Sequence, residues 1–432
     1  MDIAKLARFN EWWTTERVKE SLLKPYRRSL FNQILKFLKD RQIVLVYGLR
    51  RVGKTTLLYQ LVQQLLEDKT DKKNILYFSF DESAVDLEEL MDTYEKEVLK
   101  EKIDKAGQIY IFLDEVQKLK GWQNKVKVFY DIYPNVKFFL SGSASIAIER
   151  GAKESLAGRI YSFELAPFSY KEFMELNGAL FEFDDWKLHE KEAVRLFHDY
   201  IRKGGFPELL QESDEEKISA YIKNTVLDRI LLIDLPEEFG LKDVQLLKTI
   251  MEIAANTPGF ILNYDSLSDD LKRSKQTIMD YIYYLEYALV IKPVSNLRAG
   301  FLSTSRKLRK IYFTNTGFYS AYLNWPIEQN VFGKIVENAV LQEMGLKYYY
   351  REGKKEIDFI SKEGKKILPI EVKYGKVEKE AFMNILDGLG CDSGIMITKD
   401  AYDIVKENHK KVLFVPAWLF FLFKERFLKM LA

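Results

Sequence analysis

One short stretch limits the fold of this chain more than any other. Gly48-Leu49-Arg50-Arg51-Val52-Gly53-Lys54-Thr55 lies between an apolar run, residues 43–47, and an amphipathic segment that begins at Thr56. Glycines at both ends let the backbone curl so that successive N–H groups point at phosphate oxygens, and lysine adds a cation. This order of strand, loop and helix is typical of a P-loop. The predicted nucleotide ligands are Gly48, Arg50, Arg51, Val52, Gly53, Lys54, Thr55 and Thr56, with Thr55 also a ligand of Mg²⁺.

Composition excludes several other classes of protein. The chain has 432 residues, which indicates two to four domains, and a hydrophobic fraction of 47% with 30% charged residues is ordinary for a globular protein. The net charge of +2 means that any nucleic-acid surface must be local. One cysteine and three histidines cannot form a disulfide framework or a zinc finger. These features favour a reducing cytoplasm.

The two ends of the chain lack the pattern of a targeting or membrane segment. Residues 1–5 have no apolar signal-peptide core. Residues 414–423 are apolar and aromatic, but Pro416 interrupts them and they are much shorter than the ~20 residues of a membrane span. We expect a buried strand followed by a helix there, with a membrane-surface anchor as the alternative, and we expect a cytoplasmic protein without a membrane partner.

The region around the P-loop has the pattern of a three-layer α/β domain. Nearly uninterrupted apolar runs are typical of strands buried on both faces of a parallel sheet, and helical stretches such as residues 87–99 separate them. After the P-loop helix, strands are predicted at Ile75 to Phe80, Ile109 to Leu113, Val136 to Leu140 and Ile160 to Leu165.

A helix precedes this domain. The spacing of Leu30, Phe31, Ile34, Leu35, Phe37 and Leu38 predicts it. The tandem Trp12-Trp13 nearby could stack on a bound adenine or pack the helical segment onto the core.

The predicted strand Ile109 to Leu113, the third when the strand before the P-loop is counted, is followed by Asp114-Glu115. A strand followed by two carboxylates is the Walker B pattern, in which Asp114 holds the Mg²⁺ shell and Glu115 orients and polarises the attacking water. The second acid favours hydrolysis over phosphate transfer to a small substrate, although a kinase stays an alternative.

Two further groups are candidates for the same site. Ser141 and Ser143 follow the fourth strand, where a hydroxyl can contact the attacking water or the γ-phosphate. Arg159 stands directly before the last strand and could stabilise charge on the γ-phosphate in its own subunit or in a neighbour's, or form a surface salt bridge instead. A role in a neighbour would require a homo-oligomer.

Five motifs follow one another along the chain: the P-loop, Leu113 to Lys118, Ser141 to Ser145, Leu156 to Arg159 with Pro167 to Tyr170, and Gly204 to Glu208. In this order they resemble a broad family of bacterial and archaeal AAA+-type ATPases that usually carry a C-terminal PD-(D/E)xK nuclease-like domain. The resemblance implies ATP and Mg²⁺ as cofactors and supports Arg159 as a sensor or finger arginine. It also implies a helical lid at about residues 166–235, with Gly204-Gly205 as a hinge. Asn315 stands where the family often has Asp.

Residues from about 240 to 313 have the pattern of a winged helix-turn-helix. Predicted helices cover residues 244–254, 264–271 and 272–285. Basic or amide side chains at the start of the third helix and in the expected wing could meet DNA or RNA, and docking of a protein is the alternative. They are Lys272, Arg273, Lys275, Gln276, Arg298, Arg306, Lys307, Arg309 and Lys310.

The last hundred residues carry a second chemical pattern. Glu337 lies in a helical run, Asp358 in a strand, and Glu371 with Lys373 in the next strand, the arrangement of PD-(D/E)xK nucleases. Residues two apart on a strand face the same side, so Glu371 and Lys373 would point together at a metal ion. Mg²⁺ or Mn²⁺ would be bound by Glu337, Asp358 and Glu371, and Lys373 would activate or stabilise the attacking water.

The expected organisation is an α/β chain of five parts. They are a helical lead-in (1–40), a P-loop ATPase core (41–165), a helical lid (166–235), a winged helix (236–325) and a nuclease-like domain (326–432). The expected function is Mg²⁺-dependent ATP hydrolysis that acts on nucleic acid, with Lys54, Glu115, Ser143, Arg159 and Lys373 as catalytic residues. The alternative is a nucleotide-controlled switch that binds a protein or DNA partner and does not cleave nucleic acid.

Overall fold

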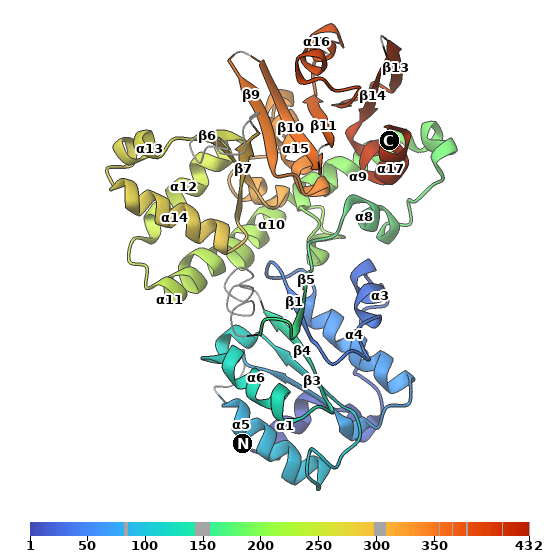
Figure 1. Cartoon of the computed structure of the whole chain (residues 1–432), viewed down its shortest axis with the longest axis vertical. Coiled ribbons are helices and arrows are strands. Elements are labelled where there is room, and N and C mark those ends of the chain that lie inside the picture. Colours follow the sequence, from blue (N-terminus) through green and yellow to red (C-terminus); the bar gives the residue numbers. More distant parts are fainter. Residues whose placement is uncertain are drawn as a thin grey trace. The chain divides into compact units, whose positions relative to one another are not determined.

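The structure is a computed structural model. It describes residues 1–81, 85–142, 156–297, 308–353, 355–364, 366–376, 379–407 and 409–431. The chain divides into two compact units, Met1–Ala166 with Tyr287–Leu289, and Pro167–Glu286 with Val290–Ala432. Each unit has its own β-sheet (Figure 1).

The sheet of the first unit is fully parallel, with the strand order β2-β3-β4-β1-β5. Its strands are β1 (Ile43–Tyr47), β2 (Ile75–Ser79), β3 (Ile109–Asp114), β4 (Val136–Gly142) and β5 (Ile160–Glu164). Each begins at the residue that the apolar pattern predicts, so the predicted α/β class with a parallel sheet is confirmed. β5 differs from the expectation of full burial, because it forms an edge of the sheet and leaves part of its surface exposed.

Helices cover both faces of this sheet (Figure 1). They are α4 (Lys54–Glu67), η1 (Lys72–Asn74), α5 (Leu87–Thr93), η2 (Tyr94–Leu99), η3 (Val116–Lys118) and α6 (Trp122–Ile132). Alternate strand residues such as Leu45, Ile111 and Phe138 join the core that contains α5 and α6. On the other face Tyr77 stacks on Tyr59 of α4, with 4.5 Å between the ring centroids. The unit is therefore a three-layer α/β sandwich.

The lead-in segment forms α1 (Ile3–Phe9), α2 (Trp12–Thr15) and α3 (Ser29–Leu35). The indole N–H groups of Trp12 and Trp13 donate to the same carbonyl, that of Ile75, at 3.1 and 2.9 Å. Ile75 is the first residue of β2, whereas the P-loop follows the last residue of β1, which runs parallel to β2 in the same sheet with β3 and β4 between them. The two tryptophans pack the segment onto the core, which is the second of the two alternatives drawn from the sequence.

The second unit begins with helices. They are α8 (Tyr170–Leu176), η4 (Phe183–Asp185), α9 (Trp186–Lys203), η5 (Pro207–Leu209), α10 (Glu215–Ala220), η6 (Tyr221–Leu227), η7 (Ile230–Asp234), α11 (Leu235–Phe239), α12 (Val244–Asn256), α13 (Tyr264–Leu271), α14 (Lys275–Tyr287) and η9 (Thr316–Ala321). Residues 244–313 run helix, strand, helix, helix, strand, strand, with α13 at the predicted bounds. Asn263 caps α13, because its side chain accepts the backbone N–H groups of Asp265 and Ser266.

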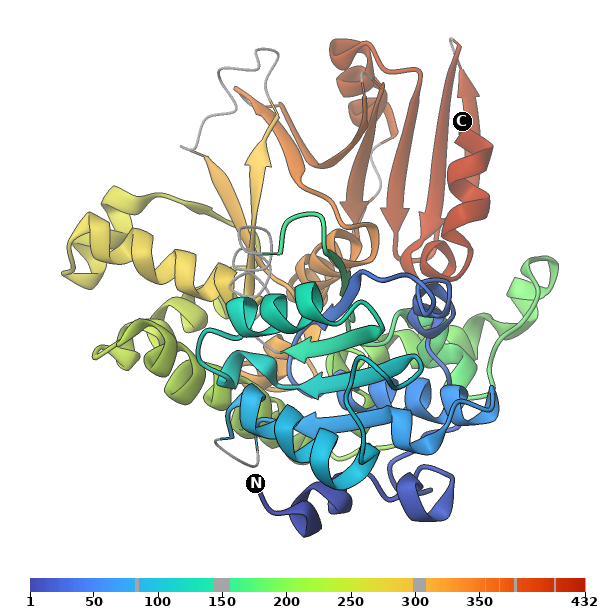
Figure 2. The same cartoon turned by 60° about the horizontal axis from the view of Figure 1, so that its bottom comes forward.

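A nine-stranded mixed sheet follows, with the order β13-β14-β12-β11-β10-β9-β7-β8-β6 (Figure 2). Its strands are β6 (Phe260–Leu262), β7 (Ile291–Asn296), β8 (Arg309–Phe313), β9 (Tyr348–Glu352), β10 (Lys355–Glu363), β11 (Lys366–Lys373), β12 (Ser393–Thr398), β13 (Asp403–Glu407) and β14 (Lys410–Pro416). Parallel pairing of β7 with β9 joins the strands of the expected winged helix to those of the expected nuclease-like domain.

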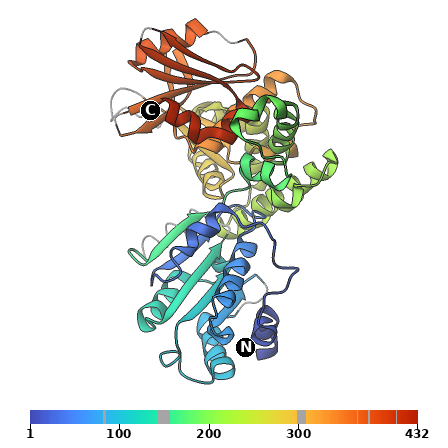
Figure 3. The ribbon, with the colours of Figure 1, turned by 90° about the vertical axis from the view of Figure 1, so that its right-hand side faces the viewer.

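Three more helices complete the second unit: α15 (Gln329–Met344), α16 (Lys379–Leu389) and α17 (Ala417–Leu431). The helix α16 packs through Phe382 and Leu386 on the sheet, and α17 contacts α8 and α9, beside which it lies in Figure 3. Strand β14 ends at Pro416 and α17 begins at the next residue, as the sequence predicted. In the described part of the chain, no helix combines the length and apolar character that crossing a bilayer requires.

Gly204-Gly205, the expected hinge, lies in a tightly packed place. Asn315 is fully buried, donates from Nδ2 to the Gly204 carbonyl at 2.6 Å, and accepts the Gly317 N–H at 2.8 Å. The Gly205 carbonyl accepts the N–H of Phe168 at 2.8 Å. Both glycines are thus bonded to neighbouring segments in this conformation.

Candidate functional site

The backbone of the P-loop takes a conformation that requires glycine at both ends. A Cβ on Gly48 would lie 2.3 Å from the carbonyl oxygen of Leu165, so only glycine fits beside this segment. Gly53 has φ of 96° and precedes the first residue of α4. The loop therefore ends at a helix N-terminus, where backbone N–H groups and the helix dipole favour an anion.

Lys54 is 5% exposed, and its ammonium is held within the loop. Its Nζ donates to the carbonyls of Gly48 at 3.2 Å and Leu49 at 2.8 Å. A cation in this position can exchange carbonyl partners for phosphate oxygens when a nucleotide binds.

Asp114 is the centre of the site. It ends β3, is 2% exposed, and accepts the Thr55 hydroxyl at 2.6 Å on Oδ2 and the Glu115 N–H at 3.1 Å on Oδ1. Ser141, which ends up beside it because β3 and β4 pair in parallel, also donates to Oδ1. The structure thus brings together the predicted residues Thr55, Asp114 and Ser141. Thr55 and Asp114 present adjacent hard oxygens, a donor set that fits Mg²⁺.

A residue that sequence reasoning missed also contacts Asp114. Tyr77 on β2 is 2% exposed and donates its hydroxyl to Oδ2 at 2.9 Å. Burial and the negative charge of Asp114 raise the pKa of Tyr77 well above its usual value, so the phenol keeps its proton. The available signal was a tyrosine within a strand predicted to be buried, because a buried phenol needs a hydrogen-bond partner.

Glu115 has a left-handed backbone, with φ of 51° and ψ of 42°. Such a conformation is costly for a residue other than glycine and is often found at functional sites. The carboxylate accepts from the Gln117 amide at 2.5 Å. Ser143, the other predicted hydroxyl, lies outside the residues that the structure describes.

Arg159 lies at the far end of the sheet from the P-loop. Its carbonyl accepts the N–H of Ile43, the first residue of β1, and its Nε donates to Asp131 at 3.0 Å. The P-loop follows the last residue of β1, so about 15 Å of strand separates the two. This distance does not suit contact with a nucleotide on its own P-loop.

Three of the side chains expected to meet nucleic acid have carboxylate partners instead. Arg273 donates to Asp243 at 2.9 Å, and Lys275 pairs with Asp265 at 2.7 Å. Gln276 donates to Asp280 at 2.8 Å, while Lys272 is exposed. Arg298, Arg306 and Lys307 lie outside the described residues. Arg309 donates to Tyr264.

Lys310 corrects one expectation. It was expected on an exposed basic wing, but it is 4% exposed and lies among carboxylates. Its Nζ is 2.6 Å from Glu356, 3.9 Å from Asp358 and 4.0 Å from Glu337. Phosphate contact by this lysine is excluded in the observed conformation, because its ammonium does not reach the surface.

The residues of the expected nuclease motif do lie together, but each carboxylate already has partners. Lys373 pairs with Glu371 at 2.7 Å, and Lys334 pairs with Glu337 at 2.6 Å. Glu371 also accepts the backbone N–H of Asp358 at 3.2 Å, and Asp358 accepts that of Val372 at 2.9 Å. Tyr312 donates to Glu337 at 2.5 Å. We call Tyr312, Lys310, Lys334, Glu337, Arg351, Glu356, Asp358, Glu371 and Lys373 the carboxylate–lysine cluster.

The charges within this cluster act strongly on one another. Burial, together with the charges of Glu337 and Glu371, holds the pKa of Asp358 well above its usual range. Burial by itself would raise the pKa of Glu356, but the hydrogen bond and charge of Lys310 lower it.

The arrangement of these residues gives no support to a second metal ion. Among the described residues, no three His, Cys, Asp or Glu side chains are grouped so that they could hold a metal ion. Glu337, Asp358 and Glu371, the predicted ligands, are 2%, 7% and 8% exposed and direct oxygens at lysine ammonium and backbone N–H groups.

Comparison with known families supports the class that the first site suggests. Residues 40–174 match the model of an AAA domain, which supports a nucleotide-hydrolysing, AAA-type ATPase in the first unit. Residues 194–329 and 328–418 match two models described as domains of unknown function, DUF8612 and DUF4143. These matches do not test the nuclease-like or winged-helix assignments.

The individual relatives with similar sequences are uncharacterized proteins, so they indicate no activity. An uncharacterized protein of Haemophilus influenzae is 25% identical over 91% of this chain and 98% of its own length. One of Methanocaldococcus jannaschii is 24% identical over 78% of this chain and 76% of its own length. Similar chains therefore occur in a bacterium and in an archaeon.

Solved structures are similar only at a low level. The structure of C. elegans PCH-2 is 16% identical with a TM-score of 0.24, covering 66% of this chain and 65% of that one. The S. cerevisiae Hsp104-ADP complex is 18% identical with a TM-score of 0.31, covering 67% of this chain and 41% of that one. The matched regions are less than two thirds of those chains, and scores of this size support no further argument.

Proposed function

We propose that the chain is a Mg²⁺-dependent ATPase whose nucleotide cycle controls binding of a partner, and that it does not cleave nucleic acid. The observation that supports hydrolysis is the surroundings of Asp114, where the P-loop threonine, Ser141 and Tyr77 converge on one buried carboxylate beside Lys54.

The first unit provides a group for each requirement of hydrolysis. Backbone N–H groups of the P-loop and Lys54 bind the phosphates and withdraw charge from the γ-phosphoryl group. Thr55 and Asp114 would hold Mg²⁺, which neutralises phosphate charge when bound. Glu115 orients a water molecule and accepts its proton, once its carboxylate has left the Gln117 amide.

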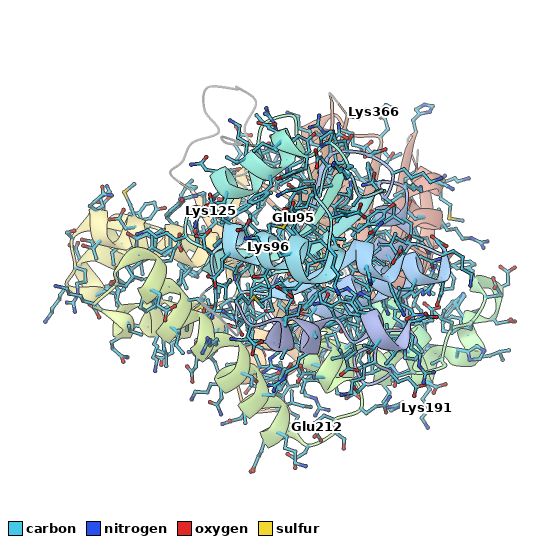
Figure 4. The ribbon with its side chains drawn as sticks, turned by 90° about the horizontal axis from the view of Figure 1, so that it is seen from below. Glu95, Lys96, Lys125, Lys191, Glu212 and Lys366 are labelled. Atoms are coloured by element: carbon cyan, nitrogen blue, oxygen red, sulfur yellow. The ribbon has the colours of Figure 1, made fainter. Side chains whose placement is uncertain are left out.

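Replacement of Lys54 tests the ATPase. Lys54→Ala removes the phosphate-binding cation, and we expect it to lower phosphate release from ATP by at least about 100-fold. Lys96→Ala, an exposed lysine on η2 that pairs with Asp92, is the matched control and should keep full activity (Figure 4). Equal rates in wild type and Lys54→Ala would mean that the hydrolysis comes from another protein or another site.

Absence of cleavage is proposed because of the carboxylate–lysine cluster. Glu337, Asp358 and Glu371 are nearly buried, and Lys310, Lys334 and Lys373 are paired with acids of the cluster. The partner-binding part would be the helix-turn-helix at residues 236–325, whose order of helices and strands supports a winged helix. Duplex DNA is the partner to try first: its affinity should fall steeply with salt if Lys272 and its neighbours contact phosphates. No binding at low salt would point to a protein partner.

Metal-dependent cleavage of nucleic acid is the second candidate. It is favoured by the adjacency of Asp358, Glu371 and Lys373 on two paired strands. Incubation of the full chain with linear, branched and single-stranded DNA or RNA in Mg²⁺ or Mn²⁺ separates the two candidates. Products that disappear in Lys373→Ala, but persist in Lys366→Ala on the same strand, would establish cleavage.

Arg159 is proposed to act on the nucleotide of a neighbouring copy, since it lies far from its own P-loop. A mixture of Arg159→Ala and Lys54→Ala proteins should then regain hydrolysis that neither has alone, because an intact arginine meets an intact P-loop. No recovery in a mixture that forms oligomers would leave Arg159 as a structural partner of Asp131.

A further inference from the structure

We propose that Lys310 is a built-in counter-cation: its ammonium replaces a divalent metal ion in the carboxylate–lysine cluster and fastens β8 to β10 and α15. This inference does not depend on ATP hydrolysis, because every residue of the cluster lies in the second unit.

The position of the ammonium is the first support. Lys310 and Tyr312 are two residues apart on β8, so they face the same side of the sheet. Their polar ends reach acids on two other elements: Lys310 contacts Glu356 on β10, and Tyr312 contacts Glu337 on α15. Strands β7 and β9 lie between β8 and β10, and the ammonium is 5.1 Å from the ring centroid of Tyr349 on β9. Lys310 thus links strands that do not pair with each other.

The balance of charge is the second support. The cluster holds four acidic side chains, those of Glu337, Glu356, Asp358 and Glu371, and four basic side chains, those of Lys310, Lys334, Arg351 and Lys373, so positive charge at least equals negative charge. The side chain of Lys310 is 5% exposed and that of Glu337 is 3% exposed, so solvent screens these two poorly. A divalent ion would add charge that the cluster does not need, and it would have to displace Lys310 from between three acids.

The direction of the oxygens is the third support. Asp358 and Glu371 each direct one oxygen at a backbone N–H of the paired strands β10 and β11. A metal ion would need these oxygens for itself, since Mg²⁺ requires near-octahedral geometry at about 2.1 Å. These carboxylate oxygens instead accept hydrogen bonds that join β10 to β11 and fix the positions of both carboxylates.

The consequence is a metal-independent ionic link across the second unit. The elements it joins are β8, from the segment expected to be a winged helix, and β10 with α15, from the segment expected to be nuclease-like. Removal of the Lys310 ammonium would take its closest partner from Glu356 and a nearby positive charge from Glu337 and Asp358, which should cost more than the loss of a surface ion pair.

Metal titration of the nucleotide-free full chain is the first test. We expect Mn²⁺ binding, followed by electron paramagnetic resonance, to be the same in wild type and in Asp358→Asn. One additional Mn²⁺ in the wild type that is lost in Asp358→Asn would overturn the proposal, because the carboxylates would then hold a metal beside Lys310.

Stability is the second test. Lys310→Met should lower the unfolding midpoint of the second unit by about 5–10 °C. The double variant with Glu356→Gln should recover at least half of the lost midpoint, because it removes the charge that Lys310 had compensated. Recovery should be incomplete, because the second substitution does not replace the packing of the lysine side chain. Lys366→Met, an exposed lysine at the start of β11, is the matched control and should leave the midpoint unchanged (Figure 4).

Lys310→Met with an unchanged midpoint, or a double variant without recovery, would overturn the ionic role. ATP hydrolysis that depends on Lys54 should persist in Lys310→Met. The ATPase assay therefore distinguishes a failure of the proposed function from a failure of the proposed role of Lys310. If Lys310→Met does not fold, the comparison of wild type with Asp358→Asn still decides the proposal.

Discussion

Asp114 and Lys310 are both buried charges, but neighbours stabilise them in opposite ways. Asp114 accepts hydroxyl groups from Thr55 and Tyr77 and a backbone N–H. Lys310 faces carboxylates. The hydroxyl donors at Asp114 carry no charge and so leave its carboxylate able to attract a cation, whereas the Lys310 ammonium already neutralises acids. These surroundings are the reason for proposing that the first site holds a metal ion and that Lys310 has a structural role.

Tyr77 provides a prediction about the nucleotide site. Tyr77→Phe removes a hydrogen bond to Asp114 while keeping the ring that stacks on Tyr59. We expect the Mg²⁺ concentration required for half-maximal ATP hydrolysis to rise by about tenfold, since partners of metal ligands typically contribute 10–100-fold. Tyr110→Phe, half-buried on β3, is the control. An unchanged Mg²⁺ requirement would show that Thr55 and Ser141 suffice to orient Asp114.

Lys137 provides a prediction about pH. It is 1% exposed and donates to the carbonyls of Asp40 and Gln42. Burial lowers the pKa of Lys137 from 10.5 to about 8. Between those two values the unfolded chain holds a proton on Lys137 that the folded chain has released. Burial of the charged ammonium therefore lowers the free energy of unfolding by its full amount below pH 8, and this loss of stability decreases as pH rises to 10.5.

The measurement compares denaturant unfolding of wild type and Lys137→Met at pH 7 and pH 10. The free energy of unfolding of the wild type should rise relative to the variant by about 1–2 kcal/mol over this range. Exposed Lys105→Met should show no such change. A difference that stays constant with pH would mean that Lys137 keeps its proton throughout.

At the scale of elements, Asn315 links the turn before η9 to the end of α9. Its amide donates to the Gly204 carbonyl while its oxygen accepts the Gly317 N–H, and an ionised carboxylate cannot make the first of these bonds because it has no proton to donate. Asp would place an ionised oxygen against the Gly204 carbonyl. The sequence alone could not show what the amide of Asn315 contacts.

Asn315→Asp should therefore destabilise the second unit by about 2–4 kcal/mol at pH 8. The loss should be smaller at pH 5, because burial raises the pKa of the new acid and its protonated form can donate to Gly204. Asn330→Asp, exposed in the first turn of α15, is the control and should be neutral or slightly stabilising, since an acid there faces the helix N-terminus. Equal stability of both variants would contradict the role of the amide.

At the scale of the whole molecule, the chain contains two units with separate sheets. Calorimetry should show two unfolding transitions, because a chain with two cores need not unfold in one step. ADP with Mg²⁺ should raise the midpoint of the transition of the first unit. At an ADP concentration 100 times the Kd, the free energy of unfolding of that unit should increase by about 2.7 kcal/mol. Lys54→Ala should abolish that shift, while Lys310→Met should lower the other transition. A single transition shifted by both changes would mean that the units unfold together.

Surface charge belongs to the same scale. Acidic and basic side chains are interspersed, as Glu95, Lys96 and Lys125 illustrate (Figure 4), and the net charge is only +2. Long-range attraction of nucleic acid is therefore weak, and any binding must depend on local contacts.

The sequence by itself determined much of the first unit. Apolar runs placed the starts of its five strands, and the spacing of glycine, lysine and acids placed the P-loop beside the end of β3. These features are local: a buried strand and a phosphate loop each need particular residues at consecutive positions. The parallel α/β class follows from the same patterns.

Only the tertiary structure decided which side chains surround each site. Tyr77 meets Asp114 because β2 pairs with β3. Arg159 is far from the P-loop because β5 pairs in parallel with β1, so the residue before β5 lies at the start of β1 and the P-loop at its end. Lys310 reaches Glu356 across two strands. Contacts of this kind join residues separated by tens of positions, and no local period encodes them. The nuclease-like motif shows the limit most clearly: its residues were found from spacing, but the lysines that neutralise them come from β8 and α15.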